Sequence, residues 1–120
     1  MNTEPKLSVD EDGIQRWYLN GKLHRTDGPA VSFPNGEQYW YLNGVEHRED
    51  GAAVIYSNGA QRWFLHGETH RTDGPAAIES DGEQYWFLNG KRYNNFTDWL
   101  AALDADDKTK TLLTLKWSSR

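Results

Sequence analysis

A histidine, an arginine and an aspartate recur together three times in the pattern His-Arg-x-Asp-Gly. The histidines are His24, His47 and His70. A histidine near a carboxylate could perform acid–base catalysis or bind a metal ion. A catalytic site is needed once, however, whereas this set is repeated in three copies of one segment. We therefore predict a structural role, in which histidine stacks on a facing tryptophan, arginine pairs with aspartate and aspartate shapes the Asp-Gly turn.

Other signatures of chemistry are missing from the sequence. There is no cysteine, so no thiol nucleophile and no thiolate metal site is possible. The glycines occur singly at turns and form neither a phosphate-binding loop nor a nucleophile elbow. The histidines have no second type of ligand at zinc-like spacing. We predict no catalysis, no metal site and no cofactor.

Five residue columns recur at a spacing of 23 residues and reveal the elements that carry these side chains. A period in this range is typical of repeat proteins, and four copies in register exclude chance. The sequence predicts four 23-residue units over about residues 6–92. The columns are Gly13, Gly36, Gly59 and Gly82; Gln15, Gln38, Gln61 and Gln84; Trp17, Trp40, Trp63 and Trp86; Leu19, Leu42, Leu65 and Leu88; and Gly21, Gly44, Gly67 and Gly90.

Each unit has the pattern of a β-hairpin. In the second unit, an extended aromatic run over 37–42 is followed by Asn43-Gly44 and a short return run over 45–48. Asn-Gly is a strong hairpin signal, because a type I′ turn needs positive φ at both central residues. Asp50-Gly51 and residues 57–59 supply further turns. We predict a mainly β fold, an elongated antiparallel meander of four hairpin repeats with a helical cap.

Side-chain alternation predicts which residues form the core. A two-residue turn at Asn35-Gly36 would place Phe33 opposite Gln38 and Val31 opposite Trp40. Alternation puts the tryptophan and leucine columns on one face, and we predict that this face is the core.

A second aromatic column lies on the opposite strand face. It is either exposed or buried by curvature of the sheet, and the sequence leaves both possibilities open. Tyrosine and arginine are enriched in interface hot spots, and a large exposed apolar stripe usually has a function. The predicted binding residues are Arg16, Tyr18, Tyr39, Tyr41, Arg62, Phe64, Tyr85 and Phe87.

The fourth unit departs from the repeat and predicts a helical end. Asn95 is a plausible N-cap, and Phe96, Trp99, Leu100 and Leu103 share one helix face. A second helix is predicted over about 107–117 with Asp106 as N-cap, although the three threonines there make a strand the competing interpretation. We predict a single domain over 1–120, with repeats over about 6–92 and the cap over about 93–120.

The hairpin motif Asn20-Gly21-Lys22-Leu23-His24 has equivalents in the later units. This motif resembles the MORN repeat, and the resemblance covers roughly residues 6–92. MORN units carry glycine after the histidine, where this chain has Arg25. The string from Trp17 to Ala30 looks like a MORN variant of phages, giant viruses and some bacteria. The resemblance implies a β-repeat scaffold that binds a partner and implies no reaction.

Charge and hydropathy limit the partners. The chain has 120 residues, 13 Lys and Arg against 18 Asp and Glu, and a net charge of -5. No basic stripe indicates nucleic-acid binding, and no apolar run is long enough to span a bilayer. The polar segment Met1–Asp12 does not resemble a signal peptide. We expect a cytoplasmic protein that binds another protein, with a small-ligand binder and a histidine-based enzyme as competing hypotheses.

Overall fold

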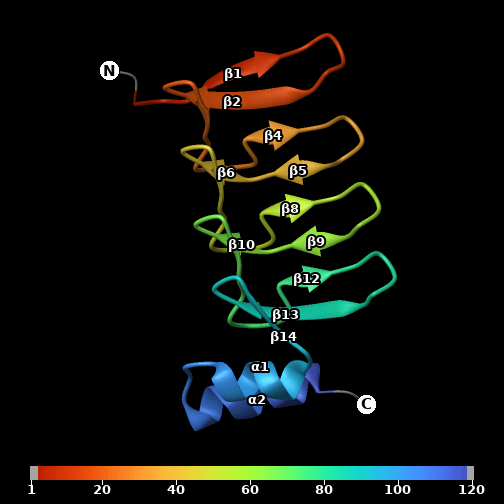
Figure 1. Ribbon diagram of the computed structural model, residues 1–120. Helices are drawn as coiled ribbons and strands as arrows, with labels where there is room; N and C mark the ends of the chain where they lie inside the picture. Colours follow the sequence, from red (N-terminus) through yellow and green to blue (C-terminus); the bar gives the residue numbers. More distant parts are fainter. Residues whose placement is uncertain (1–2, 119–120) are drawn as a thin grey trace.

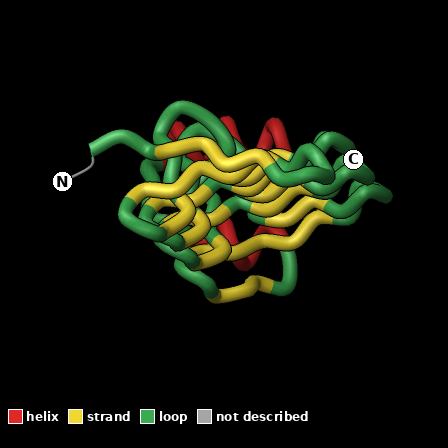
Figure 2. Tube along the Cα trace, turned by 90° about the horizontal axis from the view of Figure 1, so that it is seen from above, coloured by secondary structure: helices red, strands yellow, loops and turns green. Residues whose placement is uncertain are grey.

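The computed structural model describes residues 3–118. β-Hairpins lie one above another, and helices α1 (Phe96–Ala102) and α2 (Asp107–Trp117) close one end of the stack (Figure 1). Viewed along the stack, successive hairpins superpose, and the helices lie behind them (Figure 2). The molecule measures 47 × 33 × 20 Å. The predicted mainly β, antiparallel architecture with a helical end is confirmed.

The large sheet is an antiparallel meander in the order β1-β2-β4-β5-β8-β9-β12-β13-β14, with β3 paired to β2. Its hairpins are β1–β2, β4–β5, β8–β9 and β12–β13, and neighbouring hairpins pair through β2–β4, β5–β8 and β9–β12. The strands are β1 (Lys6–Val9), β2 (Gln15–Leu19), β3 (Lys22–Leu23), β4 (Val31–Ser32), β5 (Gln38–Tyr39), β8 (Val54–Ile55), β9 (Gln61–Arg62), β12 (Ala77–Ile78), β13 (Gln84–Leu88) and β14 (Lys91–Tyr93).

A second set of short hairpins follows the tryptophan column. Two of these form separate sheets, β6 (Tyr41–Leu42) with β7 (Val45–Glu46) and β10 (Phe64–Leu65) with β11 (Glu68–Thr69). Their turns have positive φ at both central residues, as a type I′ turn requires. The φ values are 51° and 80° at Asn43 and Gly44, and 50° and 80° at His66 and Gly67. The Asn-Gly hairpin prediction is therefore correct.

The register predicted at the other turn is wrong by one residue. Val31 pairs with Tyr39, and Ser32 pairs with Gln38. The turn is longer than two residues, because Pro34 fixes one φ and only Gly36 has positive φ, at 95°. The Asn35 side chain accepts the Glu37 amide at 3.0 Å, which stabilises this wider turn.

Hydrogen bonds between units recur at the 23-residue spacing. The Gly44 amide donates to the Leu23 carbonyl at 2.8 Å, and the Arg25 amide donates to the Tyr41 carbonyl at 3.2 Å. The equivalent bonds are Gly67 to Glu46, Gly90 to Thr69, Arg48 to Phe64 and Arg71 to Phe87. Each short hairpin is thus held to the hairpin before it.

The predicted tryptophan core is only partly correct. Ala30, Ala53 and Ala76 are completely buried, and Val54 is 2% exposed. Trp17, Trp40 and Trp63 are half-buried, and only Trp86 of that column is buried. Stacked hairpins leave little space between them, so small residues fill the centre and the large rings lie at its edge.

The helical end matches the prediction closely. Helix α1 (Phe96–Ala102) starts after Asn95, whose side chain accepts the Asp98 amide, and α2 (Asp107–Trp117) starts after Asp106. The strand alternative for this last segment is wrong. Trp86, Trp99, Leu103 and Leu113 form the buried cluster between the helices and the stack. Neither helix in the described part of the chain is long and apolar enough to cross a membrane.

Candidate functional site

The arginines of the His-Arg-x-Asp-Gly loops cover the tryptophan rings. Each guanidinium lies over the tryptophan of its own unit, pairs with the aspartate two residues later and bonds a backbone carbonyl of its loop. The distances from guanidinium carbon to ring centroid are 4.5 Å for Arg25 over Trp17, 3.8 Å for Arg48 over Trp40 and 4.0 Å for Arg71 over Trp63. Arginine therefore has the stacking role that we predicted for histidine.

The histidines connect one unit to the next. His24 Nδ1 accepts the Asn43 amide at 2.9 Å, and His47 Nδ1 accepts the His66 amide at 2.9 Å. His70 Nδ1 accepts the Asn89 amide at 2.8 Å. In each case the imidazole accepts the backbone amide of the first central residue of the next type I′ turn. The Nδ1 lone pair of each of these histidines is therefore engaged by a backbone amide.

The carboxylates of Asp27 and Asp50 are exposed and remain charged. The hydrogen bond from Arg25 lowers the pKa of Asp27, and the hydrogen bond from Arg48 lowers the pKa of Asp50. The side chains of Asp27 and Asp50 are each 82% exposed. Among residues 3–118, no three histidine or carboxylate side chains are grouped so that they could hold a metal ion. These loops therefore present negative charge over arginines that are already paired.

The structure brings together the central residues of the predicted aromatic row. Tyr39 makes edge contacts with Phe33 and Tyr56, at centroid distances of 5.8 and 6.4 Å. Arg62 lies 5.6 Å from the Tyr56 ring and pairs with Glu79 at 2.6 Å. We call Phe33, Tyr39, Tyr41, Tyr56 and Arg62 the aromatic face. Burial is the main cause that raises the pKa of Tyr39 and of Tyr41, so both phenols stay neutral.

The outer residues of the predicted row have local partners. Arg16 pairs with Asp10 at 2.9 Å, and Tyr85 lies under the Arg92 guanidinium at 4.6 Å. Tyr18 is 37% exposed, whereas Phe64 and Phe87 are half-buried in the short hairpins. The row is thus neither a fully open stripe nor a second core.

Sequence reasoning missed two of the five residues of the aromatic face. Phe33 and Tyr56 belong to a column that also contains Asp10 and Glu79, again spaced by 23 residues. This column lies beside the predicted one, and it supplies the partner of Arg16, the neighbours of Tyr39 and the partner of Arg62. Its positions just before the longer turns could have revealed it. No family model, curated protein or solved structure matches the chain.

Proposed function

We propose that this protein is a non-catalytic, MORN-like scaffold of four 23-residue hairpin units that binds another protein through its aromatic face. The observation that carries the proposal is the half-exposed cluster of Tyr39, Tyr56 and Arg62 at the middle of the stack. Tyrosine and arginine are the side chains that most often anchor protein interfaces, near their centre. Their mutual contacts hold them in place before a partner arrives.

The engagement of the histidine column supports a scaffold over an enzyme. Each Nδ1 accepts a backbone amide of the next unit, and each arginine covers a ring of its own unit. Side chains with such repeated partners maintain the repeat. The proposed partner is a host protein in the cytoplasm, since the MORN-variant resemblance points to phage-like chains. Inhibition of a host enzyme or defence system is the most specific form of the proposal.

Binding of a small ligand is the second candidate. The hollows that favour it lie between the arginine loops and are not lined by Tyr39 or Tyr56. A sugar, lipid headgroup or nucleotide that shifted only loop resonances in an NMR titration would support this candidate. Shifts at the aromatic face would support the proposed interface instead.

Affinity capture from a bacterial host lysate, followed by mass spectrometry, tests the proposal. Tyr41→Ala and Tyr56→Ala should each weaken capture of the partner by roughly 30-fold or more, as expected for hot-spot residues. Leu112→Ala on α2 is the matched control for binding through the cap, since Leu112 is 57% exposed. Folded tyrosine variants that capture the partner as well as the wild type would refute the proposal. So would loss of capture confined to a folded His24→Ala variant.

A further inference from the structure

Three successive loops line two open hollows of nearly equal size. The first, of about 460 Å³, lies between the loop at Arg25–Asp27 and Trp40 of the following unit. The second, of about 450 Å³, lies between the loop at Arg48–Asp50 and Trp63. Because Trp63 follows Trp40 by 23 residues, and the two loops have the same spacing, the grooves are repeats of one site.

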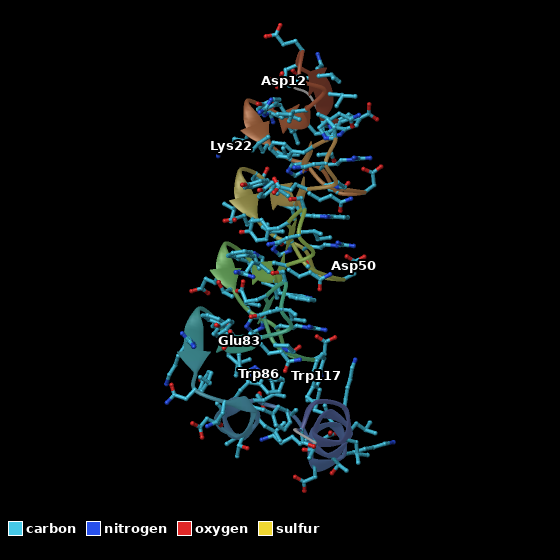
Figure 3. All side chains as sticks on the ribbon, turned by 90° about the vertical axis from the view of Figure 1, so that its right-hand side faces the viewer. Asp12, Lys22, Asp50, Glu83, Trp86 and Trp117 are labelled. Atoms are coloured by element: carbon cyan, nitrogen blue, oxygen red, sulfur yellow. The ribbon has the colours of Figure 1, made fainter. Side chains whose placement is uncertain are left out.

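The third site of this series is occupied by the chain itself. By the same spacing it would lie between the loop at Arg71–Asp73 and Trp86. Trp117 of α2 fills it, with its ring 5.5 Å from the Arg71 guanidinium carbon and edge-on to Trp86 at 5.9 Å. Trp117 projects toward the stack beside Trp86, on the side where Asp50 extends (Figure 3).

Trp117 makes a polar contact that the other loops could repeat. Its indole Nε1 donates to the Asp73 carbonyl at 2.9 Å. The fit against the loop is close, since a Cβ on Gly74 would lie 2.7 Å from Trp117 Cζ2. Gly28 and Gly51 occupy the equivalent loop positions. An indole in either open groove would therefore meet a guanidinium, a carbonyl acceptor and a glycine in the same order.

We propose that each open groove receives an aromatic side chain with an N–H donor, a tryptophan of a partner polypeptide. The ring would lie on the guanidinium of Arg25 or Arg48 and donate to the carbonyl of Asp27 or Asp50. The proposal rests on the proposed function in that the occupant belongs to a partner protein. It shares no residue with the aromatic face.

Charge at the groove rims identifies the rest of the partner. The Asp27 and Asp50 side chains are each 82% exposed, whereas Arg25 and Arg48 are 25% and 21% exposed. Glu49, which lines both grooves, is 81% exposed. A partner therefore meets carboxylates before it meets guanidinium groups. Lysine or arginine beside the tryptophan would be attracted to this rim.

The repeat distance fixes the spacing between the two tryptophans. Each unit adds two strands at about 4.8 Å apart, so the grooves recur about every 10 Å. Two residues seven positions apart on a helix lie on one face and are separated by about 10.5 Å. A basic helix with tryptophans at i and i+7 therefore matches both grooves, whereas tryptophans at i and i+5 lie on different faces.

Titration with N-acetyl-tryptophanamide tests the single groove. In the wild type, backbone amide NMR signals of Gly28 and Gly51 should shift and saturate, while that of Gly74 should not. In Trp117→Ala all three should shift, and the ligand should raise the thermal midpoint. Wild-type signals at Gly28 and Gly51 that do not move would overturn the proposal, and this arm does not depend on folding of the variant.

Helical lysine-rich peptides test the spacing. A peptide with tryptophans at i and i+7 should bind at least about tenfold more tightly than one with i and i+5, because both grooves are then engaged. Arg25→Leu should remove that advantage, and Tyr41→Ala should leave it unchanged. Equal binding of a peptide with leucines in place of both tryptophans would overturn the proposal and leave only attraction to an acidic rim. If the peptides bind as expected of the grooves but Tyr41→Ala leaves partner capture intact, the proposal for the aromatic face fails and the proposal for the grooves stands.

Discussion

In the first three units an arginine covers each tryptophan ring, whereas in the fourth unit the helices cover it. Arg48 lies 3.8 Å from the Trp40 ring centroid. Trp86 instead contacts the rings of Phe96 and Trp99, at 5.1 and 4.7 Å. The same tryptophan column therefore has a polar cover within the stack and an apolar cover at its end.

This difference explains how the stack is continued and how it is ended. The Arg48 guanidinium covers the Trp40 ring while it hydrogen-bonds Asp50 and the Ala52 carbonyl of its own loop. A loop of this kind leaves space for a further unit. The helices instead bury the last ring in a cluster with Leu103 and Leu113, which closes the sheet. Large apolar side chains are concentrated at the closed end, and alanines fill the interior of the stack.

The largest expected effect on the free energy of unfolding distinguishes the apolar cover by the helices from the polar cover by the arginines. Trp99→Ala should lower the free energy of unfolding by about 3–5 kcal/mol, because Trp99 is completely buried in the cluster. Trp40→Ala should cost about 2–3 kcal/mol, because its ring is only half-buried. Urea unfolding followed by circular dichroism measures both. Equal losses would remove the distinction between cap and stack.

A second substitution tests the polar cover directly. Arg48→Ala should lower the free energy of unfolding by about 2 kcal/mol, through loss of the cation–π contact and of the bond to the Ala52 carbonyl. Asp50→Asn is the matched control and should cost less, because the aspartate is 82% exposed. A larger loss in the control than in Arg48→Ala would mean that ion pairing, rather than ring covering, stabilises the loop.

A smaller effect, of opposite sign, is expected at the third short turn. His66 has φ of 50° where the other units have asparagine. Asparagine adopts this conformation more readily, so His66→Asn should raise the free energy of unfolding by about 0.3–1 kcal/mol. Asn43→His is the reverse control and should be destabilising. A change of the urea midpoint in the same direction for both substitutions would contradict this prediction.

The smallest effect concerns pH. The pKa values of Asp27 and Asp50 are lowered below the ordinary value of 3.8 by Arg25 and Arg48. A lowered pKa stabilises the fold above the ordinary value, and this contribution is lost as pH falls through the folded-state pKa. The double variant Asp27→Asn, Asp50→Asn should therefore lose less stability than the wild type between pH 5 and pH 2, about the range of carboxylate titration. Identical pH profiles from thermal unfolding would show that these pairs contribute nothing.

The sequence was sufficient for most features with a local cause, but the turn at Asn35-Gly36 is longer than predicted and shifts the register by one residue. Glycine and asparagine at positive φ predicted the short turns, and Asn95 and Asp106 predicted both helix starts. The core and the aromatic face could not be predicted as well, because they depend on the packing between units. Side-chain alternation assigned Trp40 to the core, and only the stack shows that Ala53 fills the centre while Arg48 covers the ring.

The histidine column joins each unit to the next through its Nδ1 atoms. His47 is 6% exposed and accepts the His66 amide at 2.9 Å, across the boundary between two units. Amide hydrogen exchange in His47→Ala tests this directly. Exchange at His66 should accelerate by about tenfold or more, while Asn43 and Asn89, bonded to the other histidines, keep their protection. Unchanged exchange at His66, or equal acceleration at all three amides, would contradict the account.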